Sequence, residues 1–196
     1  MLEYIAMNVK QIVLMLVLFV SFLGILSSCQ EKFEMFDIYD LENATLPKTK
    51  KMEQLTAREF NNIVVGHGWK ETRSYRILDH GRLDSVDYWK NREGGAPEYH
   101  EFKTDKVITY YWDSSLPALT HRERQYSYDE SENIITFDGF TAMRVIHWKT
   151  NELKVVKRAG VTYDDKKKEL KNVFLYVTLK RMTPEELETV RNAFNE

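Results

Sequence analysis

The sequence predicts a mainly β protein: an antiparallel up-and-down barrel or sandwich of eight to nine strands, with one short helix before the strands and one after them. Three observations support this prediction. Strand-like runs rich in β-branched and aromatic residues recur at short intervals, turn-forming residues separate them, and no long helical pattern stands between them. A parallel sheet is disfavoured, because its strands need long crossover connections.

A short helix is predicted to begin after Thr56, ahead of the first strand. Thr56 and Glu59 have the spacing of a capping box, in which the hydroxyl accepts a hydrogen bond from the helix backbone and the carboxylate accepts one from the capping residue. The apolar residues that follow are Phe60, Ile63 and Val64. We expect this helix to bury them.

Nine strand-like runs follow. They cover residues 69–78, 84–90, 98–103, 107–113, 121–129, 133–138, 142–149, 153–159 and 171–181. The stretches between them are rich in Gly, Asp, Asn and Lys, as is typical of tight turns. Short connections of this kind join antiparallel neighbours, so each run is expected to pair with the next.

The chain closes with a second predicted helix. Thr183 provides a hydroxyl cap, Pro184 suits the first helical turn, and Glu186 stands at the third helical position. The apolar residues of one face are Leu187, Val190 and Phe194. This spacing predicts that the helix packs against the barrel.

The N-terminal segment carries an apolar run over residues 12–26, shortly before Cys29, which is the only cysteine. At 1.5 Å per residue the run covers about 22 Å, less than the roughly 30 Å hydrocarbon core of a bilayer, so a spanning helix is disfavoured. A buried structural thiol is also disfavoured, because polar residues follow Cys29 directly. The run fits a signal peptide over residues 1–28, with Met1 or Met7 as its start.

The end of this segment, Leu26-Ser27-Ser28-Cys29, resembles the lipobox of bacterial lipoproteins, in which a small residue precedes a cysteine that becomes acylated. The resemblance implies that Cys29 is the mature N-terminus and anchors the protein through acyl chains such as palmitate. Gln30 follows Cys29. In the better-known sorting scheme only an aspartate there retains a lipoprotein at the inner membrane. The resemblance therefore implies an outer-membrane lipoprotein of the cell envelope, at its periplasmic face or on the cell surface.

Charge and cysteine content limit the function further. The chain has 28 Lys plus Arg and 30 Asp plus Glu, a near balance that argues against a nucleic-acid binder. Because there is a single cysteine, no disulfide can form within the chain. The stability of the fold must therefore come from packing.

Residues 29–54 are predicted to be a mostly extended tether that leads to the barrel domain, residues 55–196. Their apolar residues show neither a two-residue nor a 3.6-residue period. The most apolar positions are Phe33, Phe36, Ile38 and Leu41. Two interpretations stay open: some of these side chains pack on the barrel wall, or they form a docking strip for a partner.

A short helix, the stretch "GHGWK", eight or so meandering strands and a terminal "VTLKRM" together resemble the lipocalin-like lipoproteins of Bacteroidota. The resemblance covers residues 55–182 and favours a lipocalin-like β-barrel. It implies that Trp69 closes the base of the barrel and that Arg181 stacks on its ring. In lipocalins the glycine stands two residues before the tryptophan, whereas here glycines stand one and three residues before Trp69.

Alternation along two strands gives candidate ligand contacts. In the first strand one face carries Trp69, Glu71, Arg73, Tyr75 and Ile77, and in the fifth it carries Arg122, Arg124, Tyr126 and Tyr128. If the aromatic faces point inward, Arg73 and Arg124 enter the lumen and need partners or an anionic ligand. The alternative is that these arginines pair with Glu71 or lie in water near a barrel mouth. The candidate ligand-binding residues are thus Trp69, Arg73, Tyr75, Arg124, Tyr126 and Tyr128.

No catalytic or metal site is predicted. The five histidines are dispersed, with no pairing at metal-ligand spacing; they are His67, His80, His100, His121 and His147. The sequence contains no nucleophile-elbow pattern and no phosphate-cradling glycine loop. We therefore expect neither an enzyme nor a bound cofactor, with a hydrolase as a third alternative behind the two functions below.

Two functions stay open. The first is an outer-membrane, lipid-anchored barrel that binds a small apolar or anionic molecule, such as a fatty acid. The second is a cell-envelope interaction module whose barrel is filled with side chains and which docks a protein or glycan partner. An open lumen favours the first, and a filled lumen with an exposed apolar patch favours the second.

Overall fold

The computed structural model describes residues 36–37, 46–49, 52–78, 81–88, 90, 97–113 and 118–193. The predicted signal peptide, Cys29 and most of the predicted tether lie outside these residues. Within the described part of the chain, no helix is both long enough and apolar enough to cross a membrane.

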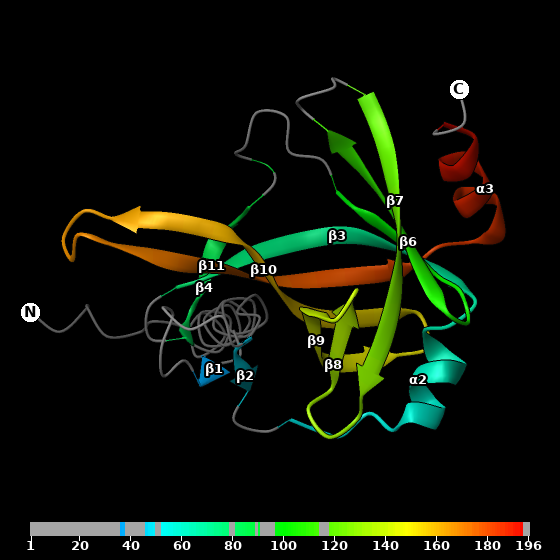
Figure 1. Cartoon of the computed structure of the whole chain (residues 1–196), viewed down its shortest axis with the longest axis horizontal. Helices are drawn as coiled ribbons and strands as arrows, with labels where there is room; N and C mark the ends of the chain where they lie inside the picture. The colour runs from blue at the N-terminus through cyan, green and yellow to red at the C-terminus, as the bar shows by residue number, and fades with distance from the viewer. Residues whose placement is uncertain are drawn as a thin grey trace, which may run out of the picture. The chain divides into compact units, whose positions relative to one another are not determined.

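Nine strands form one antiparallel sheet that closes into a barrel (Figure 1). They are β3 (His67–Ile77), β4 (Leu83–Asp87), β5 (Tyr99–Phe102), β6 (Lys106–Asp113), β7 (Ala118–Asp129), β8 (Ile134–Phe137), β9 (Phe140–Lys149), β10 (Glu152–Asp164) and β11 (Glu169–Arg181). From β5 to β11 each strand pairs with the next, and β3 closes the ring by pairing with both β5 and β11. The remaining strand, β4, pairs only with the last residues of β3. The predicted up-and-down barrel is therefore confirmed, with eight strands in the ring and β4 as a ninth beside it.

Two short helices accompany the barrel, as predicted. α2 (Ala57–Ile63) begins at Thr56, whose hydroxyl accepts a hydrogen bond from the backbone N–H of Glu59 at 3.3 Å. Glu59 in turn accepts from the backbone N–H of Thr56 at 3.0 Å, so the capping box is confirmed. α3 (Pro184–Ala193) follows Thr183, which exchanges the same two hydrogen bonds with Glu186.

α3 packs against the outer face of the barrel, as its sequence predicts. A Cβ atom at Gly68 would lie only 2.9 Å from Leu187 Cδ1, so helix and strand approach closely here and a larger residue would make the Leu187 side chain move. Arg191 of α3 donates to both carboxylate oxygens of Glu101 in β5, at 2.7 and 3.2 Å. Tyr110 of β6 donates to the same carboxylate at 3.0 Å. The last apolar residue of the predicted helical face, Phe194, lies outside the described residues.

One end of the barrel interior, which we call the apolar end, is filled with side chains. Phe60 of α2 stacks on Tyr128 at a centroid distance of 4.1 Å and meets Phe102 edge-on at 6.3 Å. Trp69 is fully buried, and its indole N–H donates to the carbonyl of Val64 at 3.2 Å. The other buried members of this cluster are Leu55, Val107, Ile135, Phe137, Met143, Val145, Leu153, Val155, Val173, Leu175, Val177 and Leu179; of these, Phe137 and Met143 stand at the boundary with the cavity described below. α2 therefore covers this end, where its apolar face is packed among interior side chains.

A second apolar cluster lies on the outer face of the sheet and includes part of the tether. Leu46, which is 2% exposed, packs with Ile77, Leu83, Ile146, Val156, Phe174 and Tyr176. The buried Arg144 donates to the carbonyl of Leu46 at 3.3 Å and to the Glu132 carboxylate at 3.0 Å. Nearby in sequence, the backbone of β1 (Phe36–Asp37) pairs with β2 (Lys48–Thr49). Tether residues thus pack on the barrel wall through Leu46. Of the four tether residues predicted to do so, Phe33, Ile38 and Leu41 lie outside the described residues, and Phe36 is described by its backbone alone.

A bulge in β3 overturns part of the predicted alternation. Opposite β11, Glu71 pairs with Leu179 but Arg73 pairs with Thr178, so Thr72 is an extra residue on β3. Trp69 and Glu71 precede the bulge and face the interior. Tyr75 follows it and packs in the outer apolar cluster. The prediction that Arg73, Tyr75 and Ile77 share a face with Trp69 and Glu71 is therefore wrong, because one inserted residue moves every later side chain to the other face.

Candidate functional site

Beyond the apolar end, the barrel interior contains a polar cavity of about 520 Å³. We call this region the polar end. The residues around the cavity come from β7, β8, β9 and β10, and from β5 with the residue before it. They are Glu98, His100, Arg124, Phe137, Ala142, Met143, Lys157, Arg158, Ala159 and Gly160. Charged and apolar groups therefore face the same space.

A buried ion cluster forms one side of the polar end. The Lys157 ammonium donates a short hydrogen bond to Oε1 of Glu71 and a second, of 3.0 Å, to Oε2 of Glu98. Glu71 is 2% exposed and Lys157 is 8% exposed.

Burial opposes ionisation of both Glu71 and Lys157. For Glu71, the Lys157 ammonium and the His100 imidazole outweigh burial, so its pKa lies below the usual range. For Lys157, the two carboxylates outweigh burial and raise its pKa. Both groups are therefore charged inside the barrel.

The backbone explains why the two carboxylates lie side by side. The N–H of Glu71 donates to the carbonyl of Glu98 at 3.0 Å, which continues the pairing of β3 with β5 by one step. His100 stands two residues after Glu98, on the same face, and pairs across the sheet with Trp69. Three polar side chains on adjacent strands therefore point into one place.

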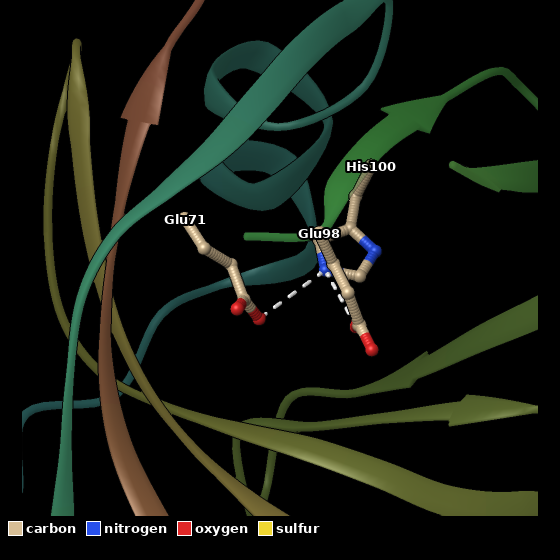
Figure 2. A group of neighbouring side chains, drawn as sticks. All are labelled: Glu71, Glu98 and His100. Atoms are coloured by element: carbon tan, nitrogen blue, oxygen red, sulfur yellow. Dashed lines mark ion pairs between the residues drawn. The ribbon is translucent and has the colours of Figure 1, made fainter. Parts of the chain in front are cut away.

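His100 is held between these carboxylates, as Figure 2 shows. Its Nδ1 lies 3.2 Å from the Thr109 hydroxyl, which fixes the orientation of the ring. Its Nε2 lies 3.8 Å from Oε1 of Glu71 and 3.7 Å from Oε2 of Glu98, which is beyond hydrogen-bonding distance. The side chain is 2% exposed, and Nε2 has no hydrogen-bond partner among the described residues. A buried imidazole nitrogen therefore faces two carboxylates without bonding to them.

Arg124 of β7 brings a further positive charge to the cavity. Its guanidinium lies over the Phe137 ring, 4.5 Å from the centroid, and Nη2 donates to the Thr109 hydroxyl at 3.3 Å. The Nε atom is buried and has no hydrogen-bond partner in the described part of the chain. Burial, followed by the repulsion of Arg122, lowers the pKa of Arg124. Because an arginine stays protonated in proteins, this donor is a charged group with unused hydrogen-bonding capacity.

The structure separates the predicted ligand-binding residues into three groups. Arg124 lines the cavity, as proposed from its strand position. Tyr126 and Tyr128 face inward but lie at the apolar end, where their hydroxyls donate to the carbonyls of Lys103 at 2.9 Å and Leu55 at 2.6 Å. Trp69 lies in the same core. Arg73 and Tyr75 are on the outer face, away from the cavity.

Trp69 and Arg181 are direct cross-strand partners. The stacking of Arg181 on the Trp69 ring, which the resemblance implies, stays a prediction. The Arg181 guanidinium donates to Nδ1 of His67 at 2.8 Å and to the carbonyl of Thr150 at 3.4 Å. Partial burial, then the charge of Arg181, lowers the pKa of His67. A neutral imidazole is the form that accepts this hydrogen bond.

Sequence reasoning missed Glu98, His100 and Lys157. They lie far from Glu71 along the chain and come together only because the barrel closes. A weak signal was present, since Glu98 and His100 alternate with Tyr99 in a strand whose face also carries Phe102. Polar residues at such inward positions indicate a polar interior, but they do not identify which residues meet.

Comparison with known proteins does not assign a family. No protein-family model matches the chain, and no curated protein matches it at a significant level.

Proposed function

We propose that this protein is a small-molecule binding barrel whose ligand carries an anionic group. One observation carries the proposal: the Arg124 guanidinium borders a cavity with a buried, unpartnered donor. A desolvated cation of this kind is stabilised by an anion that completes its hydrogen bonds. Since a guanidinium is planar and always charged, a carboxylate can accept two parallel hydrogen bonds from it.

The apolar walls suggest the rest of the ligand. Phe137, Ala142, Met143 and Ala159 border the same cavity as Arg124. Its volume of about 520 Å³ falls within the usual range for small-ligand sites. The apolar end is filled by side chains, so a long chain could not extend along the whole barrel. A compact carboxylate with a short aliphatic or aromatic body fits this space best.

The test is a calorimetric titration of the full chain with hexanoate and benzoate, and with hexanol and benzyl alcohol as neutral analogues. Wild type should bind the acids, and Arg124→Met should lose most of that affinity while the alcohols bind alike in both proteins. Arg73→Met is the matched control, because Arg73 is an exposed arginine on the outer face. Equal binding of acids and alcohols, or a loss of acid binding in Arg73→Met alone, would contradict the proposal.

We further propose that the barrel is an outer-membrane lipoprotein, similar to the lipocalin-like lipoproteins of Bacteroidota and anchored through acyl chains on Cys29. This part rests on the apolar run and the lipobox-like sequence that ends at Cys29. Metabolic labelling with a palmitate analogue should mark wild type, and Cys29→Ala should be unlabelled and released into the soluble fraction. A Cys29→Ala protein that still fractionates with membranes would contradict the anchor.

An interaction module is the second candidate, favoured by the hairpin of β10 and β11. Val161, Tyr163 and Leu170 are 53%, 53% and 63% exposed, and the register places them on one face of this hairpin. Exposed apolar patches of this kind mark contact surfaces. If the carboxylate titration is negative, this surface becomes the better account of function.

A further inference from the structure

The cluster of Glu71, Glu98 and His100 has the geometry of a metal site. One ligand atom from each residue lies within 4.8 Å of the other two (Figure 2). In a tetrahedral site with bonds of about 2.0–2.1 Å, neighbouring ligand atoms are separated by roughly 3.3 Å. The observed separations of 3.7 and 3.8 Å between His100 Nε2 and the two carboxylates need only a small inward movement.

The orientation of His100 is the second observation that points to a ligand. A metal-binding histidine normally uses one ring nitrogen for the metal and the other for a hydrogen bond that fixes the ring. Here Nδ1 contacts the Thr109 hydroxyl and the almost fully buried Nε2 faces both carboxylates without a hydrogen-bond partner in the described structure. In the tautomer that keeps its proton on Nδ1 and donates it to the Thr109 hydroxyl, Nε2 is a buried acceptor that a cation would satisfy.

The cation present in the structure is the Lys157 ammonium, which contacts both carboxylates. Two carboxylates and one ammonium leave a formal charge of −1 when the imidazole is neutral, whereas a divalent ion balances the two carboxylates fully. Lys157 also borders the cavity, so its flexible side chain has space into which the ammonium can withdraw.

We propose that Glu71, Glu98 and His100 bind a divalent transition-metal ion, and that this ion and the Lys157 ammonium are alternative occupants of the cluster. One imidazole and two carboxylates suit Zn²⁺ or Co²⁺, whereas Mg²⁺ and Ca²⁺ prefer oxygen ligands alone. Three protein ligands leave a fourth position open, on the side that faces the cavity. The proposal goes beyond anion binding at Arg124 and is tested without an anionic ligand.

The experiment is a titration of the full chain with Zn²⁺ alone by calorimetry, together with Co²⁺ followed by its visible absorption. Wild type should bind one equivalent of Zn²⁺ and give a Co²⁺ spectrum typical of low coordination number. His100→Gln should abolish both signals. Thr109→Val, which removes the hydroxyl that contacts both the His100 ring and Arg124, should weaken Zn²⁺ binding by about tenfold. His121→Gln is the matched control, because His121 is exposed and lies outside the cluster.

Lys157→Met gives a test in the opposite direction. Removing the competing ammonium should tighten Zn²⁺ binding by at least about tenfold relative to wild type, with the same dependence on His100. If Lys157→Met does not fold, the comparison of wild type, His100→Gln and Thr109→Val decides the question alone. Undetectable Zn²⁺ binding in wild type, or binding that His100→Gln leaves unchanged, would overturn the proposal.

Discussion

The two ends of the barrel interior differ in how they are stabilised. At the apolar end, aromatic and aliphatic side chains fill the space, and the hydroxyls of Tyr126 and Tyr128 bond to backbone carbonyls. At the polar end, Glu71, Lys157 and Arg124 are charged and buried, and two nitrogen atoms have no hydrogen-bond partner among the described residues. A fully satisfied region supports the fold, whereas a region with unsatisfied buried groups indicates a site for something that is not protein. The comparison therefore assigns stability to one end and binding to the other.

The largest loss of stability is expected from a substitution at the apolar end. Trp69→Ala removes the largest fully buried side chain, so it should reduce the free energy of unfolding by about 3–5 kcal/mol. Urea denaturation followed by circular dichroism measures this loss. A change near zero would show that Trp69 does not hold the barrel closed.

A substitution in the buried ion pair should reduce the free energy of unfolding nearly as much, but for a different reason. Lys157→Met leaves the carboxylates of Glu71 and Glu98 without their cation, which should cost about 3–5 kcal/mol. Adding Glu71→Gln removes one of these charges and should recover much of the loss. A double-mutant cycle measures the coupling. If the losses of the two single variants simply add, the two groups do not act as a buried pair.

A smaller effect is expected where α2 covers the apolar end. Thr56→Ala removes the hydroxyl of the capping box and should cost about 1 kcal/mol of stability. Thr56→Ser keeps the hydroxyl and serves as the control. Thermal denaturation should give Thr56→Ser a melting temperature close to that of wild type and Thr56→Ala a lower one. Identical melting temperatures of all three proteins would mean that the cap contributes nothing to closure.

The smallest effect on stability is expected at the proposed binding residue. Arg124 is a partly buried charge with an unpartnered nitrogen, so Arg124→Met should leave the melting temperature unchanged or raise it slightly while anion binding is lost. Thermal denaturation without ligand measures the first part. A large destabilisation would indicate that Arg124 belongs to the supporting structure of the barrel.

The architecture of this protein was predictable because each strand is specified by residues that are close together in the sequence. Every strand-like run in the sequence corresponds to a strand in the structure, and both capping boxes begin helices as predicted. The short turns correctly predict the pairing from β5 to β11, but in the described part of the chain β4 pairs with β3 and not with β5, so the expected pairing is wrong at that one step. The bulge at Thr72 could not be read from the sequence pattern, since alternation continues through it without interruption. For that reason the alternation predicts the wrong face for Arg73 and Tyr75.

The candidate site was less predictable because it depends on closure of the barrel. Arg124 was identified because it shares a strand face with two tyrosines, which is a local property. Glu71 and Lys157 stand 86 positions apart and meet only when β10 and β3 are brought to the same interior. No spacing rule along one chain connects them. Similarly, Leu46 covers the outer wall, and no periodic pattern in the tether distinguishes it from the neighbouring apolar residues.

The most direct test of the difference between the two ends is a methyl NMR titration of the full chain with hexanoate. The account predicts that the methyl signals of Ala142, Met143 and Ala159 at the polar end shift, while those of Leu55, Val64 and Val107 at the apolar end stay in place. In Arg124→Met none of these signals should shift. Shifts confined to the apolar end, or no shift in wild type, would contradict the assignment of binding to the polar end.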